Sequence, residues 1–395
     1  MMPGEARMVV FGETGHPRIA ALQLALQRSG QLPAHVVDYE RLLSDPSAWS
    51  ALSPALQFAN SATVAAKLDA PSFDSRFYDA LIQRGRAATG RDTNAETTNA
   101  HGELACRHDW YAGFADLLRT LERDIAHRLA LRWLNAPEDV LLMCDKWRCQ
   151  RHLDAAGIDI PPLLGLIEGY DHLQHLIADS GCDRVFVKAR YGAAAAGVVA
   201  YRRHRDGREI AQTTAEIVVN DGRMRLFNRL APQRYTDRAQ ITALIDTLAL
   251  QGCYAEAWVP KPRAAGHAGH HFDLRVIAFS GEPRQRAARI AAHPMTNLHL
   301  GNRRGDPAVL LDPRTTRRVE ETVRAAARAF PGSASIGFDV IPTRDRCFVV
   351  EANAFGDFVQ QIRWQGADAY DDQARWVADG RCTTASSSHK VAAHG

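Results

Sequence analysis

The chain has 395 residues, of which 46% are hydrophobic and 24% are charged, and its formal net charge is +3. This composition is typical of a globular protein with two or three domains and excludes a disordered or fibrous chain. No apolar run approaches the roughly 18 to 20 residues that a bilayer span needs, and the first residues lack the apolar stretch of a secretory signal. We therefore expect a cytoplasmic protein without a membrane partner. The small net charge gives no indication of nucleic-acid binding.

The seven cysteines are scattered along the chain and include no C-x-x-C pair. An odd number without a metal-binding spacing indicates reduced thiols, most of them small core residues. This expectation agrees with a cytoplasmic protein.

The first segment has the pattern of a parallel α/β unit. The run MVVFG (residues 8–12) reads as a strand, IAALQLALQRSG (19–30) as a helix and AHVVDY (34–39) as a second strand. Gly12 and Gly15 lie at the strand-to-helix turn, but they lack the G-x-G-x-x-G spacing of a dinucleotide-binding fingerprint. The segment therefore predicts a fold and no NAD site.

The remaining chain divides into two parts that differ in their hydrophobic pattern. Residues 72–135 are mostly helical in pattern, and short apolar strands separated by turns follow from about residue 138. We predict an N-terminal α/β domain with a helical extension over 1–137 and a second domain over 138–382. The last residues, 383–395, lack apolar periodicity and predict a disordered tail.

The strongest chemical signal lies in SIGFDVIPTRDRCFVVEANAFGDF, residues 335–358. Two strand-like runs joined by a short turn around Asp345 predict a β-hairpin. Alternate residues of a strand share a face, so Glu351 and Asn353 point the same way. A turn at this position places Asp339 opposite Glu351, with Cβ atoms roughly 4.5 to 5.5 Å apart.

These three oxygen-bearing side chains, Asp339, Glu351 and Asn353, form a candidate magnesium site. Two carboxylates so close repel each other unless a cation lies between them, and hard oxygen ligands suit Mg²⁺. The set is too small for a closed cage, but it fits an ion that also binds substrate phosphates and water. The alternative, from this pattern alone, is an exposed hairpin face that carries two acids.

A second stretch, VFVKARYGAAAAGVVAYR at residues 185–202, indicates phosphate binding. An apolar strand ends in a lysine, and two glycines bracket four alanines before the next apolar strand. Small side chains leave the backbone N–H groups unobstructed, so the loop can fold over phosphates. We expect such a lysine to affect nucleotide affinity more than stability. A second lysine lies at the start of a predicted helix, and the phosphate-binding candidates are Lys146, Lys188, Gly192, Ala193, Ala194 and Gly197.

Six stretches in order carry a resemblance: DKWRCQRHLDAAGIDIPP, VFVKARYGAAAAGVV, YAEAWVP, DLRV, RIAAHPMTNLHLGNRRG and GFDVIP…FVVEANAFGDF. They resemble the successive motifs of ATP-grasp enzymes, in the style of the glutathione synthetase and ribosomal-protein glutamate ligase branch. The resemblance covers roughly residues 138 to 378, and residues 1–135 resemble the preceding α/β domain of those proteins. It implies an α/β fold in which a parallel N-terminal (pre-ATP-grasp) domain precedes a two-lobed ATP-grasp module, with a lid lobe at about 160–255 and the nucleotide between the lobes.

The resemblance also implies roles for the matched residues. The two lysines would hold the nucleotide phosphates beneath the glycine-bracketed loop. Glu256 would accept the adenine amino group, and Val259 would bond the ring through its backbone. Trp258 would line that pocket, with a plain core residue as the alternative. Asp273 would bind the ribose hydroxyls, with a loop salt bridge as the alternative.

The three hairpin residues would bind one or two Mg²⁺ ions that bridge the ATP phosphates, with Mn²⁺ as a substitute. Enzymes of this kind phosphorylate a carboxylate and let an amine attack the acyl phosphate, which requires cations around a spreading negative charge. Arg275, Arg289 and Asn297 are the candidates for that role. The implied function is an ATP- and Mg²⁺-dependent carboxylate–amine ligase that releases ADP and phosphate. Alternatives are a phosphotransferase of the same fold and a non-catalytic nucleotide-binding module, and a homo-oligomer is left open.

Overall fold

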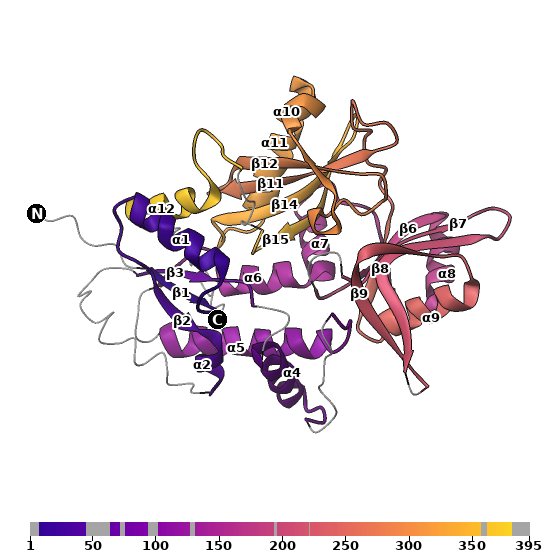
Figure 1. The fold of residues 1–395 in the computed structure, drawn as a ribbon, viewed down its shortest axis with the longest axis horizontal. Coiled ribbons are helices and arrows are strands. Elements are labelled where there is room, and N and C mark those ends of the chain that lie inside the picture. The colour runs from indigo at the N-terminus through magenta and orange to yellow at the C-terminus, as the bar shows by residue number, and fades with distance from the viewer. Residues whose placement is uncertain are drawn as a thin grey trace, which may run out of the picture.

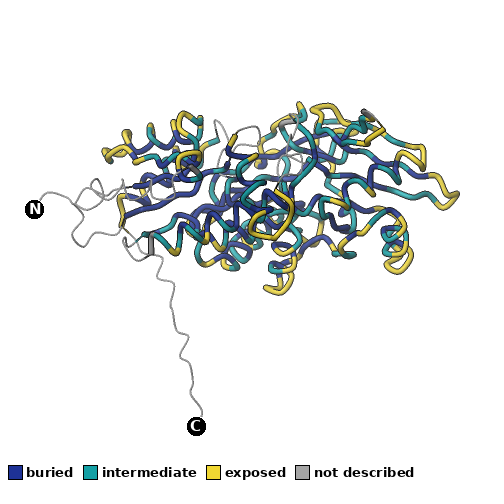
Figure 2. The backbone as a smooth tube through the Cα atoms, turned by 90° about the horizontal axis from the view of Figure 1, so that it is seen from below, coloured by how far each residue is buried: buried dark blue, intermediate teal, exposed yellow. Residues whose placement is uncertain are grey.

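The structure is a computed structural model that describes residues 8–44, 64–71, 76–93, 102–126, 131–192, 196–220, 222–356 and 362–380. The predicted tail and the two alanines predicted to bind phosphate, Ala193 and Ala194, lie outside these residues. The described part contains three sheets, with the N-terminal sheet and the lid sheet at opposite ends of the molecule (Figure 1). Exposed residues gather at loops and hairpin tips around a buried interior (Figure 2).

Helices and strands first alternate, and long runs of strands follow. In chain order they are β1 (Met8–Gly12), α1 (Pro17–Arg28), β2 (His35–Asp38), α2 (Tyr39–Ser44), β3 (Val64–Leu68), α4 (Arg76–Thr89), α5 (Arg107–Ala126), β4 (Leu131–Trp133), α6 (Pro137–Cys144), α7 (Lys146–Ala155), β5 (Leu163–Ile167), α8 (Tyr170–Ser180), β6 (Arg184–Ala189), β7 (Val198–Arg203), β8 (Glu209–Asn220), β9 (Arg223–Tyr235), α9 (Arg238–Ala249), β10 (Cys253–Ala257), β11 (His271–Phe279), β12 (Glu282–Ala291), η2 (Leu298–Leu300), β13 (Arg303–Gly305), α10 (Pro307–Leu310), α11 (Pro313–Arg328), β14 (Ser335–Pro342), β15 (Cys347–Asn353) and α12 (Ala369–Asp379).

The N-terminal sheet is parallel, with the order β2-β1-β3-β4. This confirms the predicted parallel α/β unit. The helix after β1 begins at Pro17, where His16 provides the N-cap by accepting a hydrogen bond from the Arg18 N–H. The last helix, α12, packs against α1 through residues that include Leu22 and Trp376, so the chain returns to its first layer (Figure 1).

Helices α4 and α5 cross at a contact that only glycine permits. A Cβ atom on Gly85 would lie 1.8 Å from the carbonyl oxygen of Asp109, and one on Gly113 would lie 1.9 Å from that of Leu81. Without side chains at these two positions the helix backbones approach closely, which fixes the helical extension beside the N-terminal sheet.

The lid sheet has six antiparallel strands in the order β5-β10-β6-β7-β8-β9. Val185 and Val187 of β6 face a core with helices α8 and α9, so Phe186 and Lys188 face the opposite way. The edge strand β9 pairs with a short segment from the N-terminal part, since the Leu104 N–H donates to Leu226 O at 2.8 Å. The Leu104 side chain is buried in the lid core.

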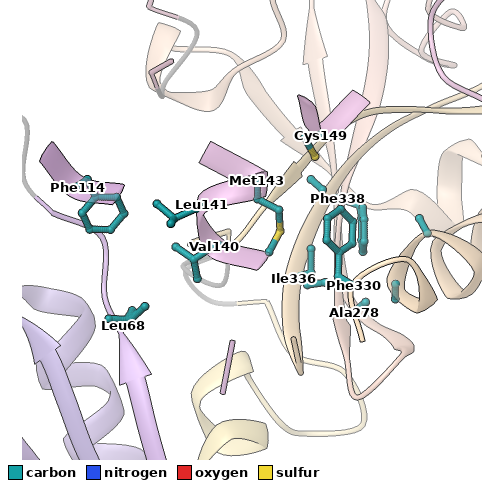
Figure 3. Close-up of a cluster of buried hydrophobic side chains, with 14 of the residues drawn as sticks. Leu68, Phe114, Val140, Leu141, Met143, Cys149, Ala278, Phe330, Ile336 and Phe338 are labelled. Carbon is teal, nitrogen blue, oxygen red and sulfur yellow. The ribbon is translucent and has the colours of Figure 1, made fainter. Parts of the chain in front are cut away.

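The third sheet has the order β13-β12-β11-β14-β15 and shares one hydrophobic core with the N-terminal sheet. Figure 3 shows this core running from Phe114 on α5, through Val140 and Met143 on α6, to Ile336 and Phe338 on β14. Helix α6 therefore joins the two sheets through apolar packing. Among the residues that the structure describes, no helix is both long enough and apolar enough to cross a membrane.

Candidate active site

A cavity lies between the lid sheet and the third sheet, and side chains from both sheets line it. The lining is formed by Lys146, Pro161, Phe186, Lys188, Ala196, Val198, Glu256, Ala257, Val259, Lys261, Asp273, Arg289, Pro294, Met295, Thr296, Asn297, Asp339, Ile341, Val350 and Glu351. The structure thus brings nine of the predicted site residues together: Lys146, Lys188, Glu256, Val259, Asp273, Arg289, Asn297, Asp339 and Glu351.

On the lid side, a buried ion pair joins Lys188 and Glu256. The register of β6 and β10 places Lys188 opposite Tyr254, so Glu256 lies diagonally across on the same face, and the lysine Nζ contacts its Oε1. The other carboxylate oxygen, Oε2, is buried without a hydrogen-bond partner among the described residues. Burial raises the pKa of Glu256, although the charge of Lys188 opposes the change. A buried, unsatisfied acceptor at a cavity can accept a hydrogen bond from a ligand.

On the opposite side, Lys146 opens helix α7 and contacts the Glu351 carboxylate of β15. Burial is the larger cause, and the positive charge of Lys188 the next, that lowers the pKa of Lys146 to about 8. Two ammonium groups that repel each other in one cavity favour an anionic ligand.

The C-terminal hairpin has the predicted register, because Asp339 pairs with Glu351. The pairing then shifts so that Val340 opposes Val349, which leaves Val350 as the extra residue of a β-bulge. Both Val350 and Glu351 line the cavity as a result.

Asn353 differs from the other two candidate metal ligands. It pairs with Gly337, its Nδ2 donates to Gly337 O at 3.3 Å, and it is not among the described residues that line the cavity. Within the described ranges, no three His, Cys, Asp or Glu side chains cluster closely enough to hold a metal ion. Of the three candidate ligands, Asp339 and Glu351 therefore line the cavity together.

Two arginines surround Asp339. Arg275 Nε donates to its Oδ1, and Arg289 Nη1 donates to its Oδ2 at 3.0 Å. Arg289 Nε also donates to Asp273 at 2.7 Å. Burial alone would raise the pKa of Asp339, but the charges of Arg275 and Arg289 outweigh it and lower that pKa. The carboxylate is therefore ionised while buried.

Asp273 is held by residues that the sequence did not reveal. Lys261 Nζ lies 3.1 Å from Asp273 Oδ2 and donates to Thr296 Oγ1 at 2.7 Å, and the Thr296 hydroxyl donates to Asp273. Asp273 forms salt bridges with Lys261 and Arg289, which agrees with the alternative interpretation, although Asp273 lies on strand β11 rather than on a loop. In the sequence, Lys261 and Thr296 could have been found only because they lie next to predicted site residues. Lys261 follows Val259 by two residues, and Thr296 directly precedes Asn297.

No family model matches the sequence, and no curated protein matches it. Among solved structures, D-cycloserine synthetase DcsG superposes with a TM-score of 0.54 at 14% identity, covering 95% of this chain and 99% of that one. A RimK domain ATP-grasp protein from Sphaerobacter thermophilus DSM 20745 gives 0.50 at 16% identity, over 94% and 99%. The ATP-grasp ligase PsnB with minimal precursor, Mg and ADP gives 0.50 at 14% identity, over 94% and 97%.

The chain has the ATP-grasp fold. The expected α/β architecture, with a parallel N-terminal sheet before two lobes, is confirmed. At these identities the similarity extends to the fold alone.

In this ATP-grasp fold, four predicted residues lie around the cavity without lining it. Trp258 packs its ring against Phe186 with the centroids 5.0 Å apart, and Arg275 reaches the cavity through Asp339. Gly192 and Gly197 have φ of 139° and 74°, values that favour glycine, and they flank the loop whose Ala196 lines the cavity. Trp258 thus contacts a residue that lines the cavity, and the role predicted for it in the adenine pocket stays a prediction.

Proposed function

We propose that this chain is an ATP- and Mg²⁺-dependent ligase that activates a carboxylate as an acyl phosphate and joins it to an amine, with release of ADP and phosphate. One observation carries the proposal. Two lysines, two hairpin carboxylates and a buried arginine from both lobes meet in a single cavity. The ligase PsnB was seen with a precursor, Mg and ADP, and DcsG is named a synthetase, which supports the same class of reaction.

The residues fit a nucleotide with its metal ion. Lys146 and Lys188 would hold the phosphates, and Asp339 and Glu351 would hold Mg²⁺, which would neutralise phosphate charge when bound. The unsatisfied Oε2 of Glu256 would accept the adenine amino group. The cavity has a volume of about 80 Å³ in this structure.

The side chains would promote phosphoryl transfer by electrostatics. Arg289 and Arg275 place guanidinium groups around Asp339, where negative charge spreads over the transferred group. Because Lys146, Lys188 and Arg289 are largely shielded from water, their charges act more strongly on a bound phosphate than they would on the surface. Asn297 lies at the same cavity and would orient the carboxylate substrate. We propose an amino acid or peptide-like amine as the acceptor.

The test is ADP release by the purified chain against paired carboxylate and amine libraries. Glu351→Gln should abolish turnover and keep the fold, because it removes metal-binding charge from a side chain that is 26% exposed. Glu320→Gln is the matched control, since Glu320 is also 26% exposed and ion-paired, but to Arg286 on the far side of the sheet. ADP release that requires one acceptor only and gives a stable phosphorylated product would favour a phosphotransferase instead. Full activity of Glu351→Gln would contradict the proposed metal site.

A further inference from the structure

An ion pair between a buried aspartate and a partly exposed arginine lies directly beside the two lysines but does not line the cavity. Asp145 is fully buried, and Arg190 holds it with two hydrogen bonds, from Nε to Oδ1 at 2.8 Å and from Nη2 to Oδ2 at 2.7 Å. This is the bidentate geometry of a strong Arg–carboxylate pair. The hydrogen bonds to Asp145 raise the pKa of the Arg190 guanidinium.

The pair connects the two lobes. Asp145 is the N-cap of α7, whose Cys149 and Leu153 belong to the core of the third sheet, and its side chain also accepts from the Arg148 N–H at 3.1 Å. Arg190 follows β6 of the lid sheet and continues its pairing with the β10 side, because its N–H donates to Gly252 O at 3.0 Å. The ion pair therefore links an element of each lobe.

Each partner is adjacent to one lysine. Lys146 directly follows Asp145, and Lys188 precedes Arg190 by two residues. The backbones are joined as well, since the Lys146 N–H donates to Arg190 O at 3.0 Å. Movement of Asp145 relative to Arg190 therefore changes the distance between the two ammonium groups.

The residue after Arg190 is fixed by the N-terminal part of the chain. The Tyr191 ring stacks on Tyr111 of α5 with the centroids 4.4 Å apart, and Arg107 Nη1 donates to Tyr191 O at 3.2 Å. The start of the glycine-bracketed loop is thus anchored on the N-terminal side, while the Asp145–Arg190 pair and the backbone contacts of Asp145 and Lys146 join it to α7.

We infer that Asp145 and Arg190 form a positioning pair that holds Lys146 and Lys188 as one binding unit for the polyphosphate of a nucleotide. The identity of the ligand rests on the proposed function, whereas the positioning rests on the contacts above. A buried ion pair need not stabilise a fold more than apolar residues of the same volume would. A positioning role is therefore identified by a variant that changes the positions of Lys146 and Lys188 by more than its loss of stability explains.

The first test needs no nucleotide. Asp145→Asn retains a good N-cap residue and removes the charge. Mass spectrometry after brief amine acylation of the full chain should show Lys146 and Lys188 reacting about tenfold faster, because the charge-assisted hydrogen bonds between Arg190 and Asp145, which fix the backbone beside both lysines, are weakened. Lys261, which the same cavity holds through Asp273 and Thr296, should keep its rate. Equal rates for Lys146 and Lys188 in the variant and the parent would overturn the inference.

Asp372→Asn is the matched control for stability. Asp372 is 1% exposed and accepts from Arg284 at 2.7 Å and from Gln285 at 2.9 Å, in contact with strand β12 and away from the lysines. Both variants should unfold at lower urea concentration, but only Asp145→Asn should speed acylation of the two lysines. The same acceleration in Asp372→Asn would show a general loosening and overturn the inference.

The second test measures affinity for ATP with Mg²⁺ by calorimetry. Asp145→Asn should weaken binding about tenfold and Asp372→Asn should leave it unchanged. Arg190→Lys, which keeps the charge but loses the bidentate geometry, should fall between Asp145→Asn and the parent, and it serves if Asp145→Asn fails to fold. If the parent binds no nucleotide while the acylation result holds, the proposed function fails and the positioning pair stands. Faster acylation with unchanged ATP affinity would contradict the claim that the positioned lysines bind the polyphosphate of a nucleotide.

Discussion

Replacing Lys188 with methionine should cost much of the protein's stability. The lysine is 8% exposed and its ammonium group contacts Glu256, which is 1% exposed. Methionine fills similar space but leaves the Glu256 carboxylate buried without its counter-charge. Removing one partner of a buried ion pair typically destabilises a fold by about 3 to 5 kcal/mol, so we expect a loss in that range near pH 8.

The loss should shrink as the pH falls. Burial already raises the pKa of Glu256 above its ordinary value of 4.5, and without Lys188 this folded-state pKa rises further. As the pH falls through the folded-state pKa, the folded variant takes up a proton and the cost of the buried charge disappears. The relief is complete once the pH reaches the unfolded-state value near 4.5.

Urea unfolding of four proteins measures this effect: the parent, Lys188→Met, Glu256→Gln and the double variant, each at pH 8 and pH 5. The double variant should be more stable than Lys188→Met at pH 8, because a neutral amide replaces the orphaned carboxylate. A loss below about 1 kcal/mol in Lys188→Met, or a double variant no better than that single one, would refute the reasoning.

Three further changes have defined outcomes. Gly113→Ala should prevent the close crossing of α4 and α5, since its Cβ would lie 1.9 Å from Leu81 O; we expect a drop of several degrees or more in Tm, and an unchanged Tm would contradict the packing. Thr296→Val should cost about 1 to 3 kcal/mol in urea unfolding because Asp273 and Lys261 lose a buried partner, whereas a neutral effect would show that water replaces the hydroxyl. Chelation of Mg²⁺ should abolish most of the rise in Tm that ATP induces, and a rise of the same size with EDTA would exclude a role for the metal in binding.

The sequence predicted those parts of the site that depend on local periodicity. Strand alternation and a short turn set the pairing of Asp339 with Glu351, and the structure has that register. The apolar strand that ends in Lys188 and the helix that begins at Lys146 are present as well. These features depend on residues close in the chain, where side-chain direction follows from backbone geometry.

The partners of these side chains were not predictable in the same way. Lys188 meets Glu256 only after β6 pairs with β10, and Arg289 meets Asp339 only after β12 and β14 both pair with β11. The sequence therefore indicated a lysine that matters mainly for nucleotide affinity, whereas its buried ion pair with Glu256 predicts that its removal also reduces stability. The return of helix α12 to α1 likewise depends on tertiary packing that no local pattern records.

The pairing of residues 102–104 with strand β9 affects how the lid can be studied alone. Strand β9 is the edge of its sheet, and unpaired edges readily recruit strands of other molecules. The backbone of Gly102 and Leu104 occupies part of that edge, while the Leu104 side chain fills a place in the lid core. An excised lid fragment would therefore carry both a bare edge and a hole in its core, and it would be prone to self-association unless the N-terminal segment were supplied with it.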